Sequence, residues 1–212
     1  MARIVAAMAM THSPGLTGWF DRAPQSHQTQ ALQAMTEMRE RLAAARPDVI
    51  VAFSNDHLLN WPINNTPEYT GRHRRGARGA RRLVRRVAGA RQVQDPRPSG
   101  AGALHRQRGA RRRLAFSYLR RMQFDDGISV PMHYLNPSSS IPLVPVTMNC
   151  TIPPIPTPER AYHVGTTLRE MLMAYPGDAR IAVLGTGGLS HEPGARATSG
   201  WTRSSTSGSS IF

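Results

Sequence analysis

Three short apolar runs place the strongest constraint on how this chain can fold. They are RIVAAMAM (residues 3–10), DVIVAFS (48–54) and RIAVLGT (180–186), and turn-forming residues lie around each of them. Apolar runs of this length without polar alternation are typical of strands that are buried on both faces of a sheet. A fourth run, IPLVPVTMN (141–149), is interrupted by Pro145 and predicts an edge or irregular strand.

Helical patterns lie between these runs. One predicted helix begins at an N-cap on Ser26 and continues towards Ala45, and its inner side carries Leu32, Met35, Met38 and Leu42. A second begins at Thr157, which precedes Pro158, and its inner side carries Val164, Leu168, Met171 and Tyr175. This alternation of strands and helices predicts an α/β fold, with a central largely parallel or mixed sheet flanked by helices.

Three of the eight histidines directly follow the three apolar runs. His12 stands in MTHSPG, His57 in FSNDH and His191 in GTGGLSH. Ligands of open α/β sheets bind beyond the carboxyl ends of the strands, so the three imidazoles together predict one shared site. Taken singly, each histidine is better explained as a turn or surface residue. The histidines that lack this placement are expected to be surface or structural residues: His27, His133 and His163.

The charge of the chain is concentrated in one segment. The sequence has 27 Arg, no Lys and 13 acidic residues, and residues 71–113 hold 15 of the Arg with a single acid, Asp95. A high pI usually indicates phosphate partners, and a basic arm that binds nucleic acid is one interpretation. However, the segment has no Phe, Trp or Tyr on which a base could stack, so we expect no nucleic-acid partner.

Length and cysteine content favour a single cytoplasmic domain. The 212 residues fit one domain, and Cys150 is the only cysteine, which excludes an internal disulfide and suits a reducing compartment. The apolar N-terminal run is too short to span a bilayer, so we expect no membrane association.

Five motifs resemble those of a known enzyme family. THSPGL, VIVAFSNDH, FDDGISVPMHYLNP, IPLVPVTMNC and GTGGLSH, in this order, are similar to the class III extradiol ring-cleavage dioxygenases. That family includes protocatechuate 4,5-dioxygenase beta subunits and 2,3-dihydroxyphenylpropionate dioxygenases. The resemblance covers residues 1–69 and 114–194. It implies cleavage of a catechol with O₂ in aromatic-compound catabolism, by an oligomer that in protocatechuate-type members includes a small partner subunit.

The same resemblance assigns roles to the histidines. The positions of His12 and His57 correspond to Fe(II) ligands, and that of His191 to the acid/base. Imidazoles and one carboxylate hold Fe(II) on one face and leave positions for catecholate and O₂, and an unligated histidine can exchange protons with the substrate. Asn55 and Asp56 are expected to orient the loop around His57.

Two departures from the family pattern affect the expected site. Where the family has Asp-His-Gly, this chain has Asp125-Asp126-Gly127, so Asp126 replaces a second active-site histidine and cannot donate a proton when ionised. The iron-binding glutamate of the family is expected beyond the end of this chain, and Glu192 is too close to His191 to replace it. We therefore expect the chain to supply two of the three protein ligands.

Residues 71–113 and 195–212 follow no core pattern and are expected to be either disordered or out-of-frame. With plausible GC-rich codons, GWTRSSTSGSS read one base out of frame gives VDEEFDEWF, and residues 71–113 shifted the other way regain lysines, aromatics and acids. We expect these segments to be translated from the wrong frame, so that the domain is incomplete, truncated at its C-terminus and inactive as printed. A metal-free relative acting as a binding or scaffold protein is the alternative function.

Overall fold

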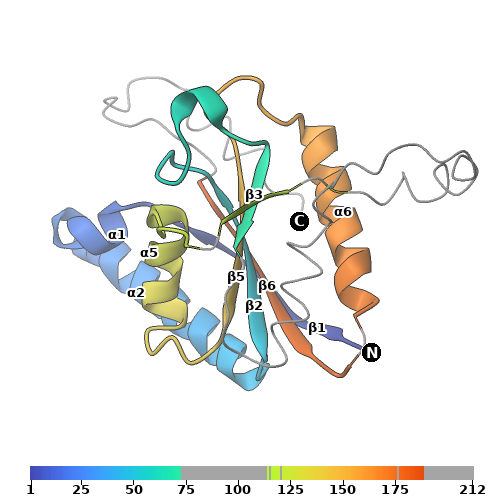
Figure 1. Cartoon of the computed structure of the whole chain (residues 1–212). Coiled ribbons are helices and arrows are strands. Elements are labelled where there is room, and N and C mark those ends of the chain that lie inside the picture. The colour runs from blue at the N-terminus through green and yellow to red at the C-terminus, as the bar shows by residue number, and fades with distance from the viewer. Residues whose placement is uncertain (73–113, 115, 120, 176, 189–212) are drawn as a thin grey trace, which may run out of the picture.

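The structure is a computed structural model that describes residues 1–72, 114, 116–119, 121–175 and 177–188. Residues 195–212, nearly all of 71–113, and His191 lie outside the described residues. The described residues form one six-stranded sheet with helices on both faces (Figure 1). The prediction of an α/β fold is therefore confirmed.

The sheet is mixed and mostly parallel. Its strands are β1 (Arg3–Thr11), β2 (Val49–Asn55), β3 (Tyr69–Arg72), β4 (Ser117–Leu119), β5 (Leu143–Met148) and β6 (Arg180–Gly187), in the order β1-β6-β2-β5-β3-β4. The first four strands in this order run parallel, β3 is antiparallel to β5, and β4 is parallel to β3. The carboxyl ends of β1, β6 and β2 therefore share one edge of the sheet.

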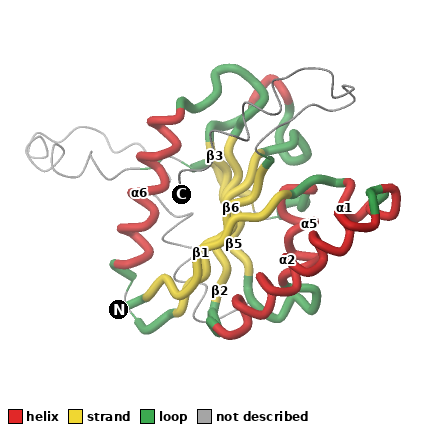
Figure 2. Tube along the Cα trace, turned by 180° about the vertical axis from the view of Figure 1, so that it is seen from behind, coloured by secondary structure: helices red, strands yellow, loops and turns green. Residues whose placement is uncertain are grey.

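Helices cover the sheet on both sides. The helices α1 (Gly15–Gly18), α2 (Gln25–Ala44) and α5 (Asp126–Leu135) lie on one face, and α6 (Pro158–Met173) lies on the other (Figures 1 and 2). Two short 3-10 helices, η1 (Phe20–Arg22) and η2 (Ile63–Asn65), lie in the connections.

Alternate residues of β2 supply the two cores. Val49 and Val51 pack in the layer that contains Leu168 of α6, whereas Ile50 and Ala52 pack in the layer that contains Met35 of α2. All four β2 residues are at most 2% exposed. The complete burial of each valine or isoleucine side chain stabilises the fold by about 1.5–3 kcal/mol, which explains why this strand is apolar on both faces from Val49 to Ala52.

The prediction that residues 141–149 form an edge or irregular strand is wrong. β5 lies inside the sheet, between β2 and β3. Pro145 is tolerated because the pairing of β3 with β5 extends only from Met148 to Val146, so no ladder bond from β3 is required at the proline.

The helix predictions are mostly confirmed, with two corrections on α2. Ser26 does not cap this helix, because Pro24 is the N-cap and its carbonyl accepts from the backbone N–H groups of His27 and Gln28. Leu32 is 46% exposed and does not face the core. Thr157 does cap α6, and its hydroxyl accepts from the Arg160 N–H at 3.2 Å.

Other surface predictions can be compared directly. The side chains expected to lie on the surface are exposed: His27, His133 and His163. Cys150 is exposed and carries a free thiol. No helix in the described part of the chain is long and apolar enough to cross a membrane.

Candidate functional site

The exits of β1 and β2 bring two histidines together. His12 directly follows β1 and His57 lies two residues after β2, and their ring centroids are 5.0 Å apart with an angle of 81° between the ring planes. His12 is buried, whereas the His57 side chain is 35% exposed. The expectation that these two imidazoles share a site agrees with this geometry. The third, His191, lies outside the described residues.

Asp125 holds His57 from two directions. Its Oδ2 accepts from the His57 ring Nδ1 at 3.0 Å and from the His57 backbone N–H at 3.2 Å. Asp125 is the N-cap residue of α5, but its side chain makes no capping bond to the helix, because the carboxylate is turned to His57 instead. The side chain is only 5% exposed, and its Oδ1 is buried without a hydrogen-bond partner among the described residues.

The loop that carries His57 is fixed by its own polar groups. The Asp56 carboxylate accepts from the Leu58 N–H at 2.8 Å, and Leu58 has a φ of 64°, so the chain makes an Asx turn around His57. The Asp56 N–H donates to the Met148 carbonyl at the end of β5. Further along, Asn60 exchanges two hydrogen bonds with the backbone of Gln123, which ties the loop to the start of α5.

His12 is held by Thr186 on the neighbouring strand. The Thr186 hydroxyl lies 3.2 Å from His12 Nδ1 and donates to the Gly127 carbonyl at 2.7 Å. Thr186 is near the end of β6, which pairs with β1 on one side and β2 on the other. One turn of α5 therefore reaches both imidazoles, through Asp125 on one side and through Gly127 and Thr186 on the other.

The surroundings of the site raise the pKa of both His57 and Asp56. The hydrogen bond with Asp125 raises the pKa of His57 above its ordinary value of 6.5, and the charges of Asp125, Asp126 and Asp56 act in the same direction against the effect of burial. Burial also raises the pKa of Asp56, although the Leu58 N–H opposes this shift. Asp126 itself is the exposed first residue of α5.

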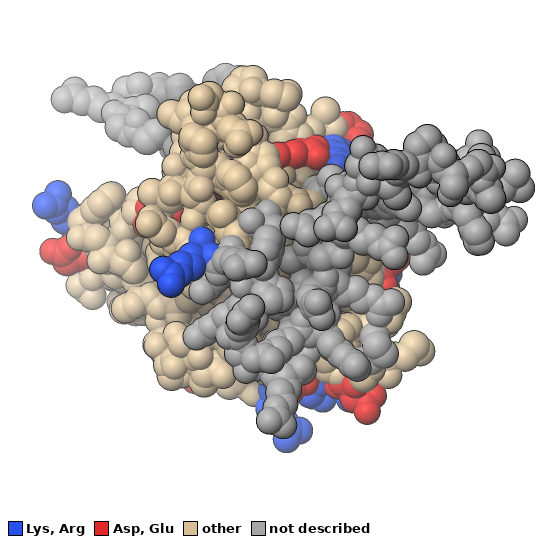
Figure 3. Space-filling view, viewed as in Figure 1, with Lys and Arg blue, Asp and Glu red and all other residues tan. Residues whose placement is uncertain are grey.

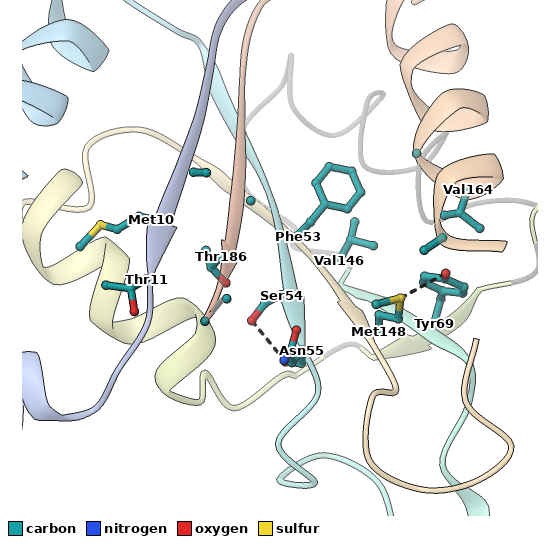
Figure 4. A pocket seen from close by; sticks show the side chains of 16 residues that line it. Met10, Thr11, Phe53, Ser54, Asn55, Tyr69, Val146, Met148, Val164 and Thr186 are labelled. Carbon is teal, nitrogen blue, oxygen red and sulfur yellow. Dashed lines mark hydrogen bonds between the residues drawn. The ribbon is translucent and has the colours of Figure 1, made fainter. Parts of the chain in front are cut away.

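An apolar pocket of about 620 Å³ opens at the same edge, on the α6 side of the sheet. Figure 4 shows Phe53 and Val146 projecting from the sheet towards Val164 of α6. Neither histidine lines the pocket, but Thr186 and Ser54, near the ends of β6 and β2, do. The pocket and the two histidines therefore lie close together at the ends of the strands, but the histidines do not form part of the pocket wall.

Comparison with known proteins assigns the family. The family described as the catalytic LigB subunit of aromatic ring-opening dioxygenase matches residues 6–202. The chain belongs to this family. Its curated relatives include 2,3-dihydroxyphenylpropionate/2,3-dihydroxicinnamic acid 1,2-dioxygenases from Photorhabdus laumondii, 27% identical over 190 residues, and from Pseudomonas putida, 29% identical over 185 residues. These alignments cover 89% and 87% of this chain but 56% and 55% of the relatives, so the chain spans about half of their length.

The LigB family generally uses a non-haem metal, and the donor atoms at the site suit one in part. Two imidazoles from separate strands can contribute two ligands on one side of an ion. Within the described ranges, no group of three or more His, Cys, Asp or Glu residues could hold a metal. The expected pair, His12 and His57, is therefore present, and any further protein ligand has to come from elsewhere.

Sequence reasoning missed the two residues that hold the imidazoles. The sequence pattern draws attention to Asp126, whereas Asp125 is the polar residue that directly precedes the helix. Thr186 is a polar residue at the end of an apolar run, where a hydroxyl in a buried strand needs a partner. Both signals are visible in the sequence, but neither identifies which histidine is the partner.

Replacing Asp125 by asparagine is expected to lower the pKa of His57, because the carboxylate that stabilises the imidazolium is lost. In the native protein the raised pKa of His57 contributes stability that is fully present below the unfolded value of about 6.5 and is lost as pH rises through the folded value. NMR titration of the His57 ring and thermal unfolding between pH 5 and 9 measure both effects. Asp21→Asn, on η1, is the control, and an unchanged His57 pKa in Asp125→Asn contradicts the prediction.

Proposed function

We propose that the protein is an Fe(II)-dependent extradiol dioxygenase that opens the ring of a catechol. The observation that carries this proposal is the pairing of His12 and His57 at the carboxyl edge of the sheet, in a chain of the LigB family. The pairing supports the proposal because the two residues lie 45 positions apart and are brought together only by the parallel arrangement of β1, β6 and β2.

His12 and His57 hold the metal in this proposal. Fe(II), when bound, supplies adjacent coordination positions for the two catechol oxygens and for O₂. Thr186 and Asp125 keep the two rings in place, and the Asx turn of Asp56 keeps the loop of His57 close to β5.

Proton transfer is assigned to His191, with Asp126 beside the site. β6 ends at Gly187, which pairs with Thr11, so the chain leaves this strand next to His12. This supports a place for His191 near the two ligands. Asp126 stands where the family has a second histidine, and its charge contributes to the raised pKa of His57, which supports a role for this carboxylate beside the site.

The substrate is proposed to be a catechol with a substituent at carbon 3, in preference to protocatechuate. The names of the curated relatives specify 2,3-dihydroxyphenylpropionate, and the pocket beside Thr186 is lined mainly by apolar side chains such as Phe53 and Met148. In the reaction, the ring C–C bond beside the diol and the O–O bond break. One oxygen atom enters the new carboxylate and the other enters the new carbonyl group, which is a ketone where the cleaved carbon carries the substituent and an aldehyde where it carries hydrogen.

Iron content and oxygen uptake test this proposal together. Because residues 71–113 and 195–212 are expected to be out of frame, the test uses the frame-corrected protein. Loaded with Fe(II) without oxygen, it is expected to retain about one iron per chain and to consume O₂ when 2,3-dihydroxyphenylpropionate is added, with a coloured ring-opened product. Protocatechuate is the comparison substrate and is expected to be consumed more slowly. If iron is bound but neither catechol is consumed, the enzymatic proposal fails.

A metal-free binding protein is the second candidate. It is favoured by the absence of a three-donor metal cluster from the described part of the chain. This candidate predicts that a catechol binds to the iron-free protein, as seen by calorimetry, and that added Fe(II) changes neither affinity nor oxygen uptake.

The Arg-rich segment, which prompted the nucleic-acid interpretation, lies outside the described residues. On the face drawn in Figure 3, the described basic side chains are scattered, several of them beside acidic side chains, and they form no continuous basic patch among the described atoms. The described surface of this face therefore offers no support for a nucleic-acid partner.

A further inference from the structure

We infer that Thr186 and Asp125 are positioning residues that keep a proton on Nδ1 of both His12 and His57, so that both rings present Nε2 to a metal. This inference deepens the proposed function and rests on it, because it concerns the same two imidazoles. A neutral imidazole carries its proton on either nitrogen, and the partner of one nitrogen decides which.

The direction of the hydrogen bonds around Thr186 follows from a proton count. A threonine hydroxyl has one proton, and the Gly127 carbonyl, 2.7 Å away, can only accept. The Thr186 hydroxyl therefore donates its proton to the Gly127 carbonyl. The contact of 3.2 Å between the hydroxyl and His12 Nδ1 can then be a hydrogen bond only if the nitrogen donates.

Asp125 imposes the same tautomer on His57 by charge. An ionised carboxylate has no proton to give, so the contact of 3.0 Å between Oδ2 and His57 Nδ1 requires a proton on the nitrogen. The His57 backbone N–H donates to the same oxygen, which fixes the carboxylate relative to the ring. Because the side chain is 5% exposed and Oδ1 has no partner among the described residues, water does not compete effectively for Asp125.

The hydrogen bonds of Thr186 with His12 and of Asp125 with His57 both depend on the first turn of α5. This turn supplies Asp125 and the Gly127 carbonyl, and it can approach β2 and β6 this closely because Gly127 has no side chain. The result is one helix start that orients two rings from different strands. Removing a residue that is hydrogen-bonded to a metal ligand typically weakens metal binding about 10–100-fold.

The first test is a measurement on the unmodified protein. In the metal-free full chain with ¹⁵N-labelled histidine, at a pH where the imidazoles are neutral, both His12 and His57 are expected to show a protonated Nδ1 and an unprotonated Nε2. The signals are assigned by the single variants His12→Gln and His57→Gln. A proton on Nε2 of either ring overturns the inference for that ring, whatever the enzymatic activity.

The second test uses variants and Co²⁺ alone as the probe. Thr186→Val, which keeps the shape of the side chain, is expected to weaken Co²⁺ binding about 10–100-fold and to mix the tautomers of His12, and Thr186→Ser is expected to restore both. In Asp125→Asn the amide can turn either its oxygen or its NH₂ group to Nδ1, so the His57 tautomer is also expected to mix.

Thr147→Val is the matched control for Thr186→Val. Thr147 is a buried β5 residue whose hydroxyl has no hydrogen-bond partner among the described residues, so its loss is expected to change neither Co²⁺ affinity nor the tautomers. Native affinity and tautomers in Thr186→Val overturn the inference, and if that variant does not fold, the unmodified protein and Thr186→Ser decide. Neither readout uses a catechol or O₂, so failure of the proposed reaction is distinguishable from failure of this inference.

Discussion

Replacing Gly127 by alanine is expected to destabilise the protein by about 1–3 kcal/mol, because the added methyl group has no space. A Cβ at this position lies 1.9 Å from the Ser54 hydroxyl oxygen and 3.0 Å from Asp125 Oδ1. Ser54 belongs to the central strand β2 and is itself buried, so it cannot move aside without disturbing the sheet. Either α5 shifts outwards or Ser54 is displaced, and denaturant unfolding monitored by circular dichroism measures the cost.

The same substitution elsewhere in the chain provides the control. Gly165 lies inside α6, and a Cβ there meets no atom within 4 Å, so Gly165→Ala is expected to stabilise the helix by about 0.5–1 kcal/mol. Ser54→Ala removes the oxygen that obstructs Gly127→Ala, so the double variant is expected to recover most of the lost stability. Additive effects of the two substitutions contradict the close packing of α5 on β2.

The closeness of α5 to the sheet could not be predicted from the sequence. An Asp-Asp-Gly triplet before an apolar helix is consistent with an ordinary turn, and only the structure shows that Gly127 lies against Ser54. By contrast, β2 and β6 could be predicted, because strands buried on both faces leave apolar runs in the sequence. β1 was also predicted as a strand, but the expectation that it is buried on both faces is wrong, because it lies at the edge of the sheet and most of its residues are exposed or partly exposed. The places of His12 and His57 at one edge then followed from the parallel direction of these strands.

The order of the strands was harder to predict from the sequence, and β5 shows why. Pro145 indicated an edge strand because a proline lacks the N–H that a central strand donates. β3 is short and its pairing ends at Val146, so a proline next to that point loses no bond from β3. The local rule is correct, but its outcome depends on the length of a neighbouring strand that the sequence does not specify.

The residues that hold the imidazoles depend on contacts between distant parts of the chain. Asp125 is 68 positions from His57, and Thr186 is 174 positions from His12. A sequence pattern reports on neighbours within a few residues, so it can place each histidine at the end of a strand without indicating which partner orients it. The positions of His12 and His57 at the strand ends were therefore predictable, whereas the groups that orient them became visible only in the fold.

Replacing His57 by alanine is expected to reduce Fe(II) and Co²⁺ binding by more than the 10–100-fold that loss of an orienting partner causes, because a ligand itself is removed. His12→Ala is expected to do the same. The two variants should differ in stability. His12 is 7% exposed and its loss leaves a cavity beside Thr186, whereas the His57 side chain is 35% exposed and little packing is lost with it.

The remaining cost of His57→Ala comes from Asp125, whose buried carboxylate then keeps, among the described residues, the backbone N–H of residue 57 as its one donor. This loss is expected to destabilise the fold by about 1–3 kcal/mol, and the double variant with Asp125→Ala should regain part of that stability without regaining metal. Metal titration by calorimetry and thermal unfolding separate the two effects. His27→Ala, which removes an exposed imidazole from α2, is the control and should leave both measurements unchanged. Because the described residues offer these two imidazoles and no larger donor cluster, undiminished metal binding in both His12→Ala and His57→Ala would place the metal elsewhere in the chain.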